Sequence, residues 1–275
     1  MFRANHLKTT ITADQPALGV WLQLGEPSIA EIASLAGYDF LILDNEHGPA
    51  SIETTIQCIR AAQAGRATAM VRAPGQDPDY LKRILDAGAE ALMIPMVETA
   101  EQAKAVVAAC KYPPEGRRGY SAPTVRASGY GADPDYAAKA NDSLFICIQI
   151  ESAKAIANAG KIAAVPGVDM MFIGVADLSG DLGLIGQLGH AKVSTQIAKA
   201  EKAVRKAGKP LGTIPRPGHT LIDLVAEGYH LVAGTADAAA LRLAFEADVN
   251  AFAPSKSKST RNGSSPNKRK KPNKI

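Results

Sequence analysis

The sequence contains little cysteine, few aromatic residues and no long hydrophobic run. Of its 275 residues, three are cysteine, one is tryptophan and 5% are aromatic. Cys58, Cys110 and Cys147 are scattered and lack the spacing of a zinc site or a disulfide framework, which favours a reducing compartment. No stretch reaches the roughly 18 apolar residues of a membrane-spanning helix, and no leader-like segment opens the chain. These absences predict a soluble protein of the cytoplasm that does not enter membranes.

Acidic residues are absent from the C-terminal segment 255–275. The formal net charge is +4, but this segment holds eight basic residues, so residues 1–254 carry about −4. A mildly acidic body argues against nucleic-acid binding. The segment is rich in Ser, Lys, Asn and Pro and is predicted to be disordered. Its run Lys268-Arg269-Lys270-Lys271-Pro272 resembles a nuclear-import signal, and a solvated basic extension is the alternative reading.

Strand-like and helix-like segments alternate through the rest of the chain, and 46% of the whole sequence is apolar. Short, continuous apolar runs predict strands that are covered on both faces. The predicted strands span residues 18–23, 40–43, 68–71, 91–97, 144–150, 168–173, 210–214 and 230–233. Capping residues and helical periodicity predict a helix after each strand. The predicted helices span residues 27–37, 52–64, 78–88, 99–111, 152–164, 191–207, 220–228 and 236–250.

Eight strand–helix units in sequence predict a (β/α)₈ TIM barrel, an α/β fold. We expect a single barrel domain over residues 18–254, with an N-terminal arm at 1–17 and the basic tail at 255–275. A doubly wound open sheet is the main alternative, but no G-x-G-x-x-G motif follows the first strand. The segment 112–142 interrupts the alternation, and its length predicts a functional loop.

Polar residues gather at the predicted C-terminal ends of adjoining strands, where the active sites of such barrels lie. Strands 4, 7 and 8 end without charge. The candidates are Asp44, Glu46 and His47 after strand 2, Arg72 at strand 3, Gln149 and Glu151 at strand 5, and Asp177 after strand 6.

Glu151 and Asp177 each end a buried apolar run. A lone buried carboxylate is costly because its desolvation is uncompensated, so two on neighbouring strands predict a shared cation. Oxygen ligands suit Mg²⁺ or Mn²⁺. Gly174 would let the backbone approach a ligand closely. Helix caps or loop ion pairs are the alternative explanation for both carboxylates.

Arg72 is suited to an enolate oxygen or a carboxylate, and the alternative is that it balances nearby charge. His47 is predicted to be a general acid/base, with Asp44 close enough to orient its imidazole. Glu46 is expected to support this group. Trp21 either forms a wall of the pocket or packs in the core. No lysine stands at a predicted strand end, which disfavours a Schiff-base mechanism.

These motifs resemble the HpcH/HpaI family of class II, metal-dependent pyruvate aldolases. The similarity extends over roughly residues 18–250. Its matching stretches are residues 43–49, 71–74, 85–88, 94–99, 112–119, 149–151 and 174–179. Asn45 stands where a Gly is usual, and Val175 where a Pro is usual. Neither change removes a reacting group, although both reshape the pocket.

The resemblance implies a (β/α)₈ barrel, often assembled as a hexamer that exchanges a C-terminal helix. It implies reversible cleavage of a 4-hydroxy-2-oxo acid to pyruvate and an aldehyde through a metal-bound pyruvate enolate, with Mg²⁺, Mn²⁺ or Co²⁺. Candidate substrates are 4-hydroxy-2-oxoheptanedioate and 2-dehydro-3-deoxyglucarate. An oxaloacetate decarboxylase or an enzyme like the related macrophomate synthase is the alternative. A non-catalytic binding or nuclear protein is a third.

The family's residue roles carry over to matching positions of this sequence. Glu151 and Asp177 would ligate the metal, with Gln149 close by. Arg72 would hold the pyruvate carbonyl, and His47, with Asp44, would handle the proton of the aldol hydroxyl. Asp86 would assist the active site of a neighbouring subunit. The remaining substrate-binding candidates are Gly174, Ala176 and Trp21, with the backbone around Ala176 and Asp177 receiving the pyruvate carboxylate.

Overall fold

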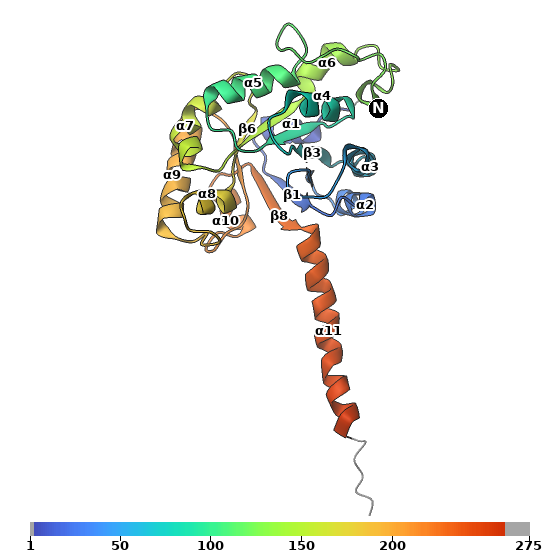
Figure 1. The fold of residues 1–275 in the computed structure, drawn as a ribbon, viewed down its shortest axis with the longest axis vertical. Helices are drawn as coiled ribbons and strands as arrows, with labels where there is room; N and C mark the ends of the chain where they lie inside the picture. Colours follow the sequence, from blue (N-terminus) through green and yellow to red (C-terminus); the bar gives the residue numbers. More distant parts are fainter. Residues whose placement is uncertain (1–2, 262–275) are drawn as a thin grey trace, which may run out of the picture. The chain divides into compact units, whose positions relative to one another are not determined.

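The computed structural model describes residues 3–261. Eight parallel strands close into a barrel in chain order (Figure 1), which confirms the predicted TIM barrel. The strands are β1 (Ala17–Leu22), β2 (Phe40–Asp44), β3 (Thr68–Arg72), β4 (Ala91–Ile94), β5 (Phe145–Ile150), β6 (Met170–Ile173), β7 (Leu211–Thr213) and β8 (Leu231–Ala236). Six strands lie within two residues of their predicted bounds at each end, and β8 continues three residues past its predicted end. Strand β4 ends three residues early because Pro95 and the left-handed backbone of Met96 leave the ladder.

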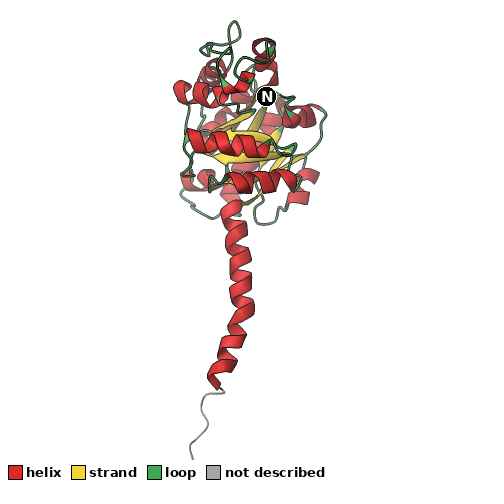
Figure 2. Ribbon diagram, turned by 90° about the vertical axis from the view of Figure 1, so that its right-hand side faces the viewer, coloured by secondary structure: helices red, strands yellow, loops and turns green. Residues whose placement is uncertain are grey.

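Helices surround the strands (Figure 2). The helices of residues 3–261 are α1 (His6–Thr12), α2 (Pro27–Leu35), α3 (Ile52–Ala62), α4 (Pro78–Asp86), α5 (Ala100–Cys110), α6 (Tyr136–Ser143), α7 (Ala153–Ala163), α8 (Val175–Asp181), α9 (Ala191–Lys206), α10 (Leu221–Ala226) and, almost wholly outside the barrel unit, α11 (Asp237–Arg261), with a 3₁₀ turn η1 (Arg126–Ser128). The eight predicted helices are all present. Helices α1, α6 and α8 were not predicted, because each has only seven or eight residues and too few turns to show a periodic pattern.

The barrel core has two layers that follow the alternation of side chains along each strand. On β2, Leu41 and Leu43 pack outward against the helices, while Phe40 and Ile42 fill the interior. Helix α1 adds Leu7 to the interior layer, so the N-terminal arm contributes to the barrel core. Helix α1 thus covers the N-terminal end of the barrel, and the C-terminal ends of the strands are left to form a site.

The chain divides into two compact units, residues 1–237 and the part from Ala238 on. Within the first unit, the carboxylate of Asp237 accepts the N–H groups of Gln23 at 2.9 Å and Leu24 at 3.1 Å, which ties the end of β8 to the end of β1. Helix α11 continues to Arg261, past the predicted start of a disordered tail, because no glycine or proline occurs between Ser255 and Arg261. The import-like run 268–272 lies outside the described residues.

No helix among residues 3–261 has the length and hydropathy needed to cross a membrane.

Candidate active site

The alternation of side chains brings polar residues from neighbouring strands together at the C-terminal mouth of the barrel. Ile42 and Met70 belong to the interior core, so Asp44 and Arg72, each two residues further along, also face inward. The strand register places Asp44 directly beside Arg72. Adjacent strands therefore place the carboxylate of Asp44 and the guanidinium of Arg72 at the same level of the barrel.

Arg72 is the fixed centre of the site. Its Nε donates to Asp44 Oδ1 at 2.9 Å and one terminal nitrogen donates to Oδ2 at 2.5 Å, which is a bidentate pair. The other terminal nitrogen lies 3.1 Å from Glu46 Oε2. The guanidinium stacks on Trp21, with 4.5 Å from its central carbon to the ring centroid. Of its five N–H donors, two remain for a substrate.

Asp44 holds two groups in place. Burial raises its pKa, but the hydrogen bonds and charge of Arg72 outweigh burial and keep the pKa below its usual value. Asp44 Oδ1 also accepts the backbone N–H groups of Glu46 and His47, each at 3.1 Å. The expected contact between Asp44 and the His47 imidazole is therefore replaced by contacts to the backbone, because Arg72 occupies both carboxylate oxygens.

His47 is exposed at the mouth, with 57% of its side chain accessible. The carboxylate within ion-pairing range of its ring is Glu46, 3.9 Å from Nε2. Burial raises the pKa of Glu46, and the charges of Arg72 and His47 offset this only in part. Glu46 thus lies between Arg72 and His47, and its supporting role stays a prediction.

Glu151 lies immediately after β5 and is 2% exposed. Its Oε1 accepts the backbone N–H of Met96 at 2.7 Å, and its Oε2 accepts a hydrogen bond from the Gln149 amide. Burial raises the pKa of Glu151 to about 7, and the negative charges of Asp177 and Glu46 add to the rise. The proximity expected between Gln149 and Glu151 is confirmed.

Asp177 lies in the first turn of α8 and not on a strand tip, because α8 begins at Val175 directly after Gly174. The first hydrogen bond of α8 is donated by the N–H of Leu178 to the carbonyl oxygen of Gly174, at 3.1 Å. The N–H groups of Ala176 and Asp177 are therefore outside the helical ladder and available at the mouth. Gly174 itself is required, since a Cβ there would meet Glu151 Oε2 at 2.5 Å.

The donor set fits a hard divalent cation. Glu151 and Asp177 supply carboxylate oxygens, and the side-chain oxygen of Gln149 is buried without a hydrogen-bond partner in the described structure. Over residues 3–261, no cluster of three or more His, Cys, Asp or Glu side chains is arranged to hold a metal. Two carboxylates and an amide oxygen leave room for water and a chelating substrate, as Mg²⁺ usually requires.

A cavity of about 640 Å³ opens at the C-terminal mouth of the barrel. His47, Arg72, Ala176 and Asp177 line it. Trp21 also lines it and packs edge-to-face against the core residue Phe172, so it has both of its predicted positions. The sequence did not single out Gln23, although it follows Trp21 at the spacing of an inward-facing residue. Its amide lies 3.4 Å from Asp44 Oδ2. The rest of the lining consists of Ile214, Pro215, Leu221, Gly234, Thr235 and Ala236.

Asp86 does not join this site within one chain. It ends α4, which leads into the N-terminal end of β4, at the opposite end of the barrel from the mouth. Its Oδ1 accepts a hydrogen bond from Arg118 at 2.6 Å. A role for Asp86 in a neighbouring subunit stays a prediction.

The fold and the site define a (β/α)₈ barrel protein with an arginine–carboxylate centre at its C-terminal mouth. Residues 17–245 match the family described as HpcH/HpaI aldolase/citrate lyase. The chain is 42% identical over 210 residues to the hydroxypyruvate/pyruvate aldolase of Agrobacterium fabrum, covering 76% of this chain and 79% of that protein. It is 41% identical over 234 residues to a 4-hydroxy-2-oxovalerate aldolase of Novosphingobium aromaticivorans, covering 85% and 88%.

Solved structures agree with these relatives. A family protein from Burkholderia cenocepacia superposes with a TM-score of 0.85 at 36% identity, over 90% of this chain and 99% of that one. Macrophomate synthase superposes with a TM-score of 0.78 at 30% identity, over 92% and 89%. The chain belongs to the HpcH/HpaI aldolase/citrate lyase family.

Proposed function

We propose that this chain is a divalent-metal-dependent aldolase that reversibly cleaves a 4-hydroxy-2-oxo acid into pyruvate and an aldehyde. The observation that carries the proposal is a guanidinium, Arg72, fixed by Asp44 at the same barrel mouth as two carboxylates, Glu151 and Asp177. This combination suits a 2-oxo acid that becomes an enolate. Relatives named as aldolases support the reaction class.

Binding of the 2-oxo acid uses the carboxylates and the guanidinium at the mouth. Glu151 and Asp177, with the Gln149 oxygen nearby, would hold Mg²⁺, Mn²⁺ or Co²⁺. When bound, the cation supplies Lewis-acid polarisation of the 2-oxo group. Arg72 donates its two remaining N–H groups to the same oxygen as negative charge develops there. The N–H groups of Ala176 and Asp177 receive the substrate carboxylate.

Bond cleavage requires removal of the proton from the C4 hydroxyl group. His47 is the exposed base that lines the cavity, and it takes this proton. The C3–C4 bond then breaks, its electron pair enters the enolate of pyruvate, and the aldehyde leaves. Protonation of the enolate at C3 gives pyruvate. Arg72 acts at the enolate, and His47 acts at the hydroxyl.

Replacing His47 with alanine is expected to slow aldol cleavage at least about a hundredfold, the usual contribution of a general base. Pyruvate C3 proton exchange should fall less than tenfold, because the enolate forms at Arg72. Cleavage is measured as pyruvate release and exchange by proton NMR in D₂O. His230→Ala is the control, since His230 pairs with Asp14 at the other end of the barrel. Equal losses in both assays would assign His47 to the enolate step.

Pyruvate release from a panel of 4-hydroxy-2-oxo acids tests the proposed reaction directly. Release is expected with Mg²⁺, Mn²⁺ or Co²⁺ and is expected to be lost in EDTA. Full release in the presence of the chelator would contradict the metal requirement. The same panel identifies the aldehyde partner among the candidates, including succinic semialdehyde from 4-hydroxy-2-oxoheptanedioate.

Decarboxylation of oxaloacetate is the second candidate function, favoured by the structural similarity to macrophomate synthase. It uses the same enolate at Arg72 but needs no base at the C4 hydroxyl. Release of CO₂ from oxaloacetate by the His47→Ala variant at the native rate, with no aldehyde released by the native protein, would favour this reaction over aldol cleavage.

We also propose a homo-oligomer, a hexamer by family resemblance, with α11 as the helix that packs on a neighbouring subunit. Its Leu241, Phe245, Val249 and Phe252 recur at spacings of four, four and three residues, so they share one helix face. All four are exposed in the single chain. An apolar face of this kind marks a protein–protein contact.

The double variant Phe245→Glu, Val249→Glu is expected to shift the protein to smaller species by analytical ultracentrifugation, because it places charges on that face. The double variant Arg242→Glu, Glu246→Arg is the matched control, since it reverses an exposed ion pair on the same helix. An unchanged sedimentation coefficient for the first variant would remove α11 from the interface.

A further inference from the structure

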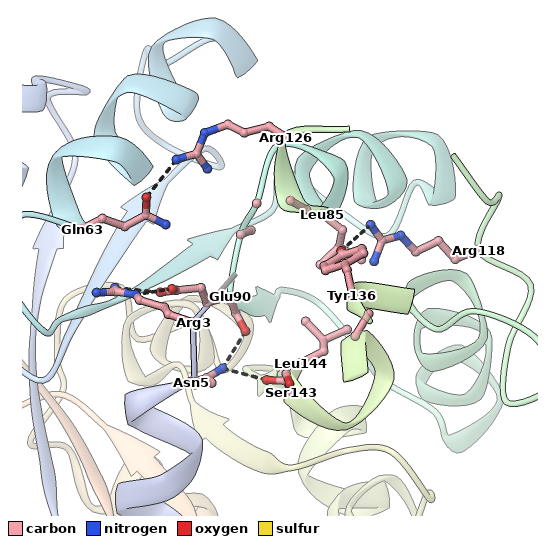
Figure 3. A pocket seen from close by; sticks show the side chains of 14 residues that line it. Arg3, Asn5, Gln63, Leu85, Glu90, Arg118, Arg126, Tyr136, Ser143 and Leu144 are labelled. Carbon is pink, nitrogen blue, oxygen red and sulfur yellow. Dashed lines mark hydrogen bonds and ion pairs between the residues drawn. The ribbon is translucent and has the colours of Figure 1, made fainter. Parts of the chain in front are cut away.

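A second, smaller cavity lies at the N-terminal end of the barrel, next to the turn before β4. Figure 3 shows the side chains that line it. It has a volume of about 50 Å³ and lies between the N-terminal segment, the turn that precedes β4 and the segment 118–144. Three arginines line it, Arg3, Arg118 and Arg126, against one carboxylate, Glu90. The proposed aldolase reaction uses none of these residues.

Arg3 is fully paired within the protein. Its guanidinium contacts both oxygens of Glu90, at 2.5 and 3.1 Å, and donates to the carbonyl groups of Gly65 and Ala67. These two charges cancel. Arg118 is also paired, with the carboxylate of Asp86, so Arg126 is the arginine of this cavity without a carboxylate partner among residues 3–261.

Arg118 is buried and held by contacts on one side, and its Nε–H group is without an acceptor. Its side chain is 3% exposed and lies over the ring of Tyr112 at 4.3 Å, and one terminal nitrogen donates to Asp86 at 2.6 Å. Its Nε is buried and has no hydrogen-bond partner in the described structure. A buried charged donor without an acceptor is costly, which points to an acceptor inside the cavity.

Arg126 bonds only to neutral acceptors. Its terminal nitrogens donate to the Ala87 carbonyl and to Gln63 Oε1, both at 2.9 Å (Figure 3 shows the second bond). No carboxylate of residues 3–261 forms an ion pair with it. Gly88 is necessary for this position, because a Cβ there would lie 2.6 Å from an Arg126 nitrogen. Burial lowers the pKa of Arg126, and the neighbouring Arg60 lowers it further.

We infer that this cavity binds one small oxyanion between Arg118 and Arg126. The anion would accept from the Arg118 Nε and balance the charge of Arg126. Since a buried water needs about 10–15 Å³, a cavity of about 50 Å³ admits an ion of phosphate or formate size and excludes nucleotides and sugar phosphates. The bound ion would join the segment that carries both arginines to α3 and α4, through Gln63 and Ala87.

Sodium phosphate and sodium formate, each titrated at constant ionic strength against sodium chloride, test the site in the full-length protein freed of metal. We expect a saturable rise in Tm of about 3–6 °C at a hundred times the Kd, with a matching heat in calorimetry. A response to phosphate alone or to formate alone supports the site and identifies the oxyanion class. The absence of a saturable response to either ion overturns the proposal.

Arg126→Gln should weaken binding at least tenfold, and Arg126→Lys should weaken it less because the charge is kept. The matched control is Arg60→Gln, which removes a neighbouring exposed charge that does not line the cavity, and it should bind as the native chain does. Binding that persists in Arg126→Gln and is lost in Arg72→Ala would place the ion at the barrel mouth and overturn the proposal. The test does not depend on aldolase activity.

Discussion

Replacing Arg72 with alanine is expected to reduce pyruvate C3 proton exchange at least about a thousandfold. One donor to a developing oxyanion contributes about 10²–10³ in rate, and Arg72 offers two free N–H groups at the cavity. The variant also releases Trp21 and Asp44 from their contacts with the guanidinium. Exchange is followed by proton NMR in D₂O with the metal present.

A second variant distinguishes unfolding of Arg72→Ala from loss of its catalytic group. Arg72→Ala leaves the Asp44 carboxylate buried without its partner, which costs about 3–5 kcal/mol. The double variant Asp44→Asn, Arg72→Met removes both charges and is expected to recover most of this stability without recovering exchange. Exchange within tenfold of the native rate in Arg72→Ala would show that the enolate forms without this guanidinium.

Glu151→Gln is expected to weaken Mg²⁺ binding at least about a hundredfold and to abolish pyruvate release, because a neutral amide replaces a carboxylate ligand of nearly the same shape. Mn²⁺ binding followed by electron paramagnetic resonance measures the first effect independently of activity. Glu98→Gln is the control, since Glu98 is an acceptor for Ser152 and Lys154 outside the cavity. Native Mn²⁺ affinity in Glu151→Gln would remove Glu151 from the cation site.

Glu151→Gln is expected to stabilise the folded protein when no metal is bound, although it weakens metal binding. The pKa of Glu151 is raised to about 7 in the folded protein, from 4.5 in the unfolded chain. The folded state therefore holds the proton more tightly, and this carboxyl group lowers the free energy of unfolding as the pH rises from about 4.5 to 7. A shift of that size corresponds to about 3 kcal/mol. Glu151→Gln should flatten this dependence and raise the metal-free protein's Tm at pH 8.

The barrel was predictable because its strands are short, apolar and buried on both faces. The start of β4 at Ala91 follows from that pattern, but its end does not, because the left-handed backbone of Met96 depends on tertiary contacts such as its hydrogen bond to Glu151. Helix α8 was missed for a related reason. It has seven residues, and its start at Val175 moves Asp177 from a strand tip to a helical turn.

The polar residues at the mouth were predictable from their position at strand ends, but their contacts were not. Spacing alone suggested that Asp44 orients the His47 imidazole. The strand register instead places Asp44 beside Arg72, which takes both of its oxygens. The spacing of Gln23 from Trp21 was available in the sequence, but its contact with Asp44 depends on the pairing of β1 with β2. The domain boundaries and the roles of the site residues stay predictions.

Pyruvate C3 proton exchange in metal-depleted protein, before and after addition of Mg²⁺, Mn²⁺ or Co²⁺, isolates enolate formation, because it requires neither an aldehyde nor His47. We expect no exchange above the uncatalysed rate in EDTA, full exchange with the cation, and none in Arg72→Ala or Glu151→Gln under either condition. Exchange at the same rate with and without the cation would contradict a metal-supported enolate site formed by Arg72, Glu151 and Asp177.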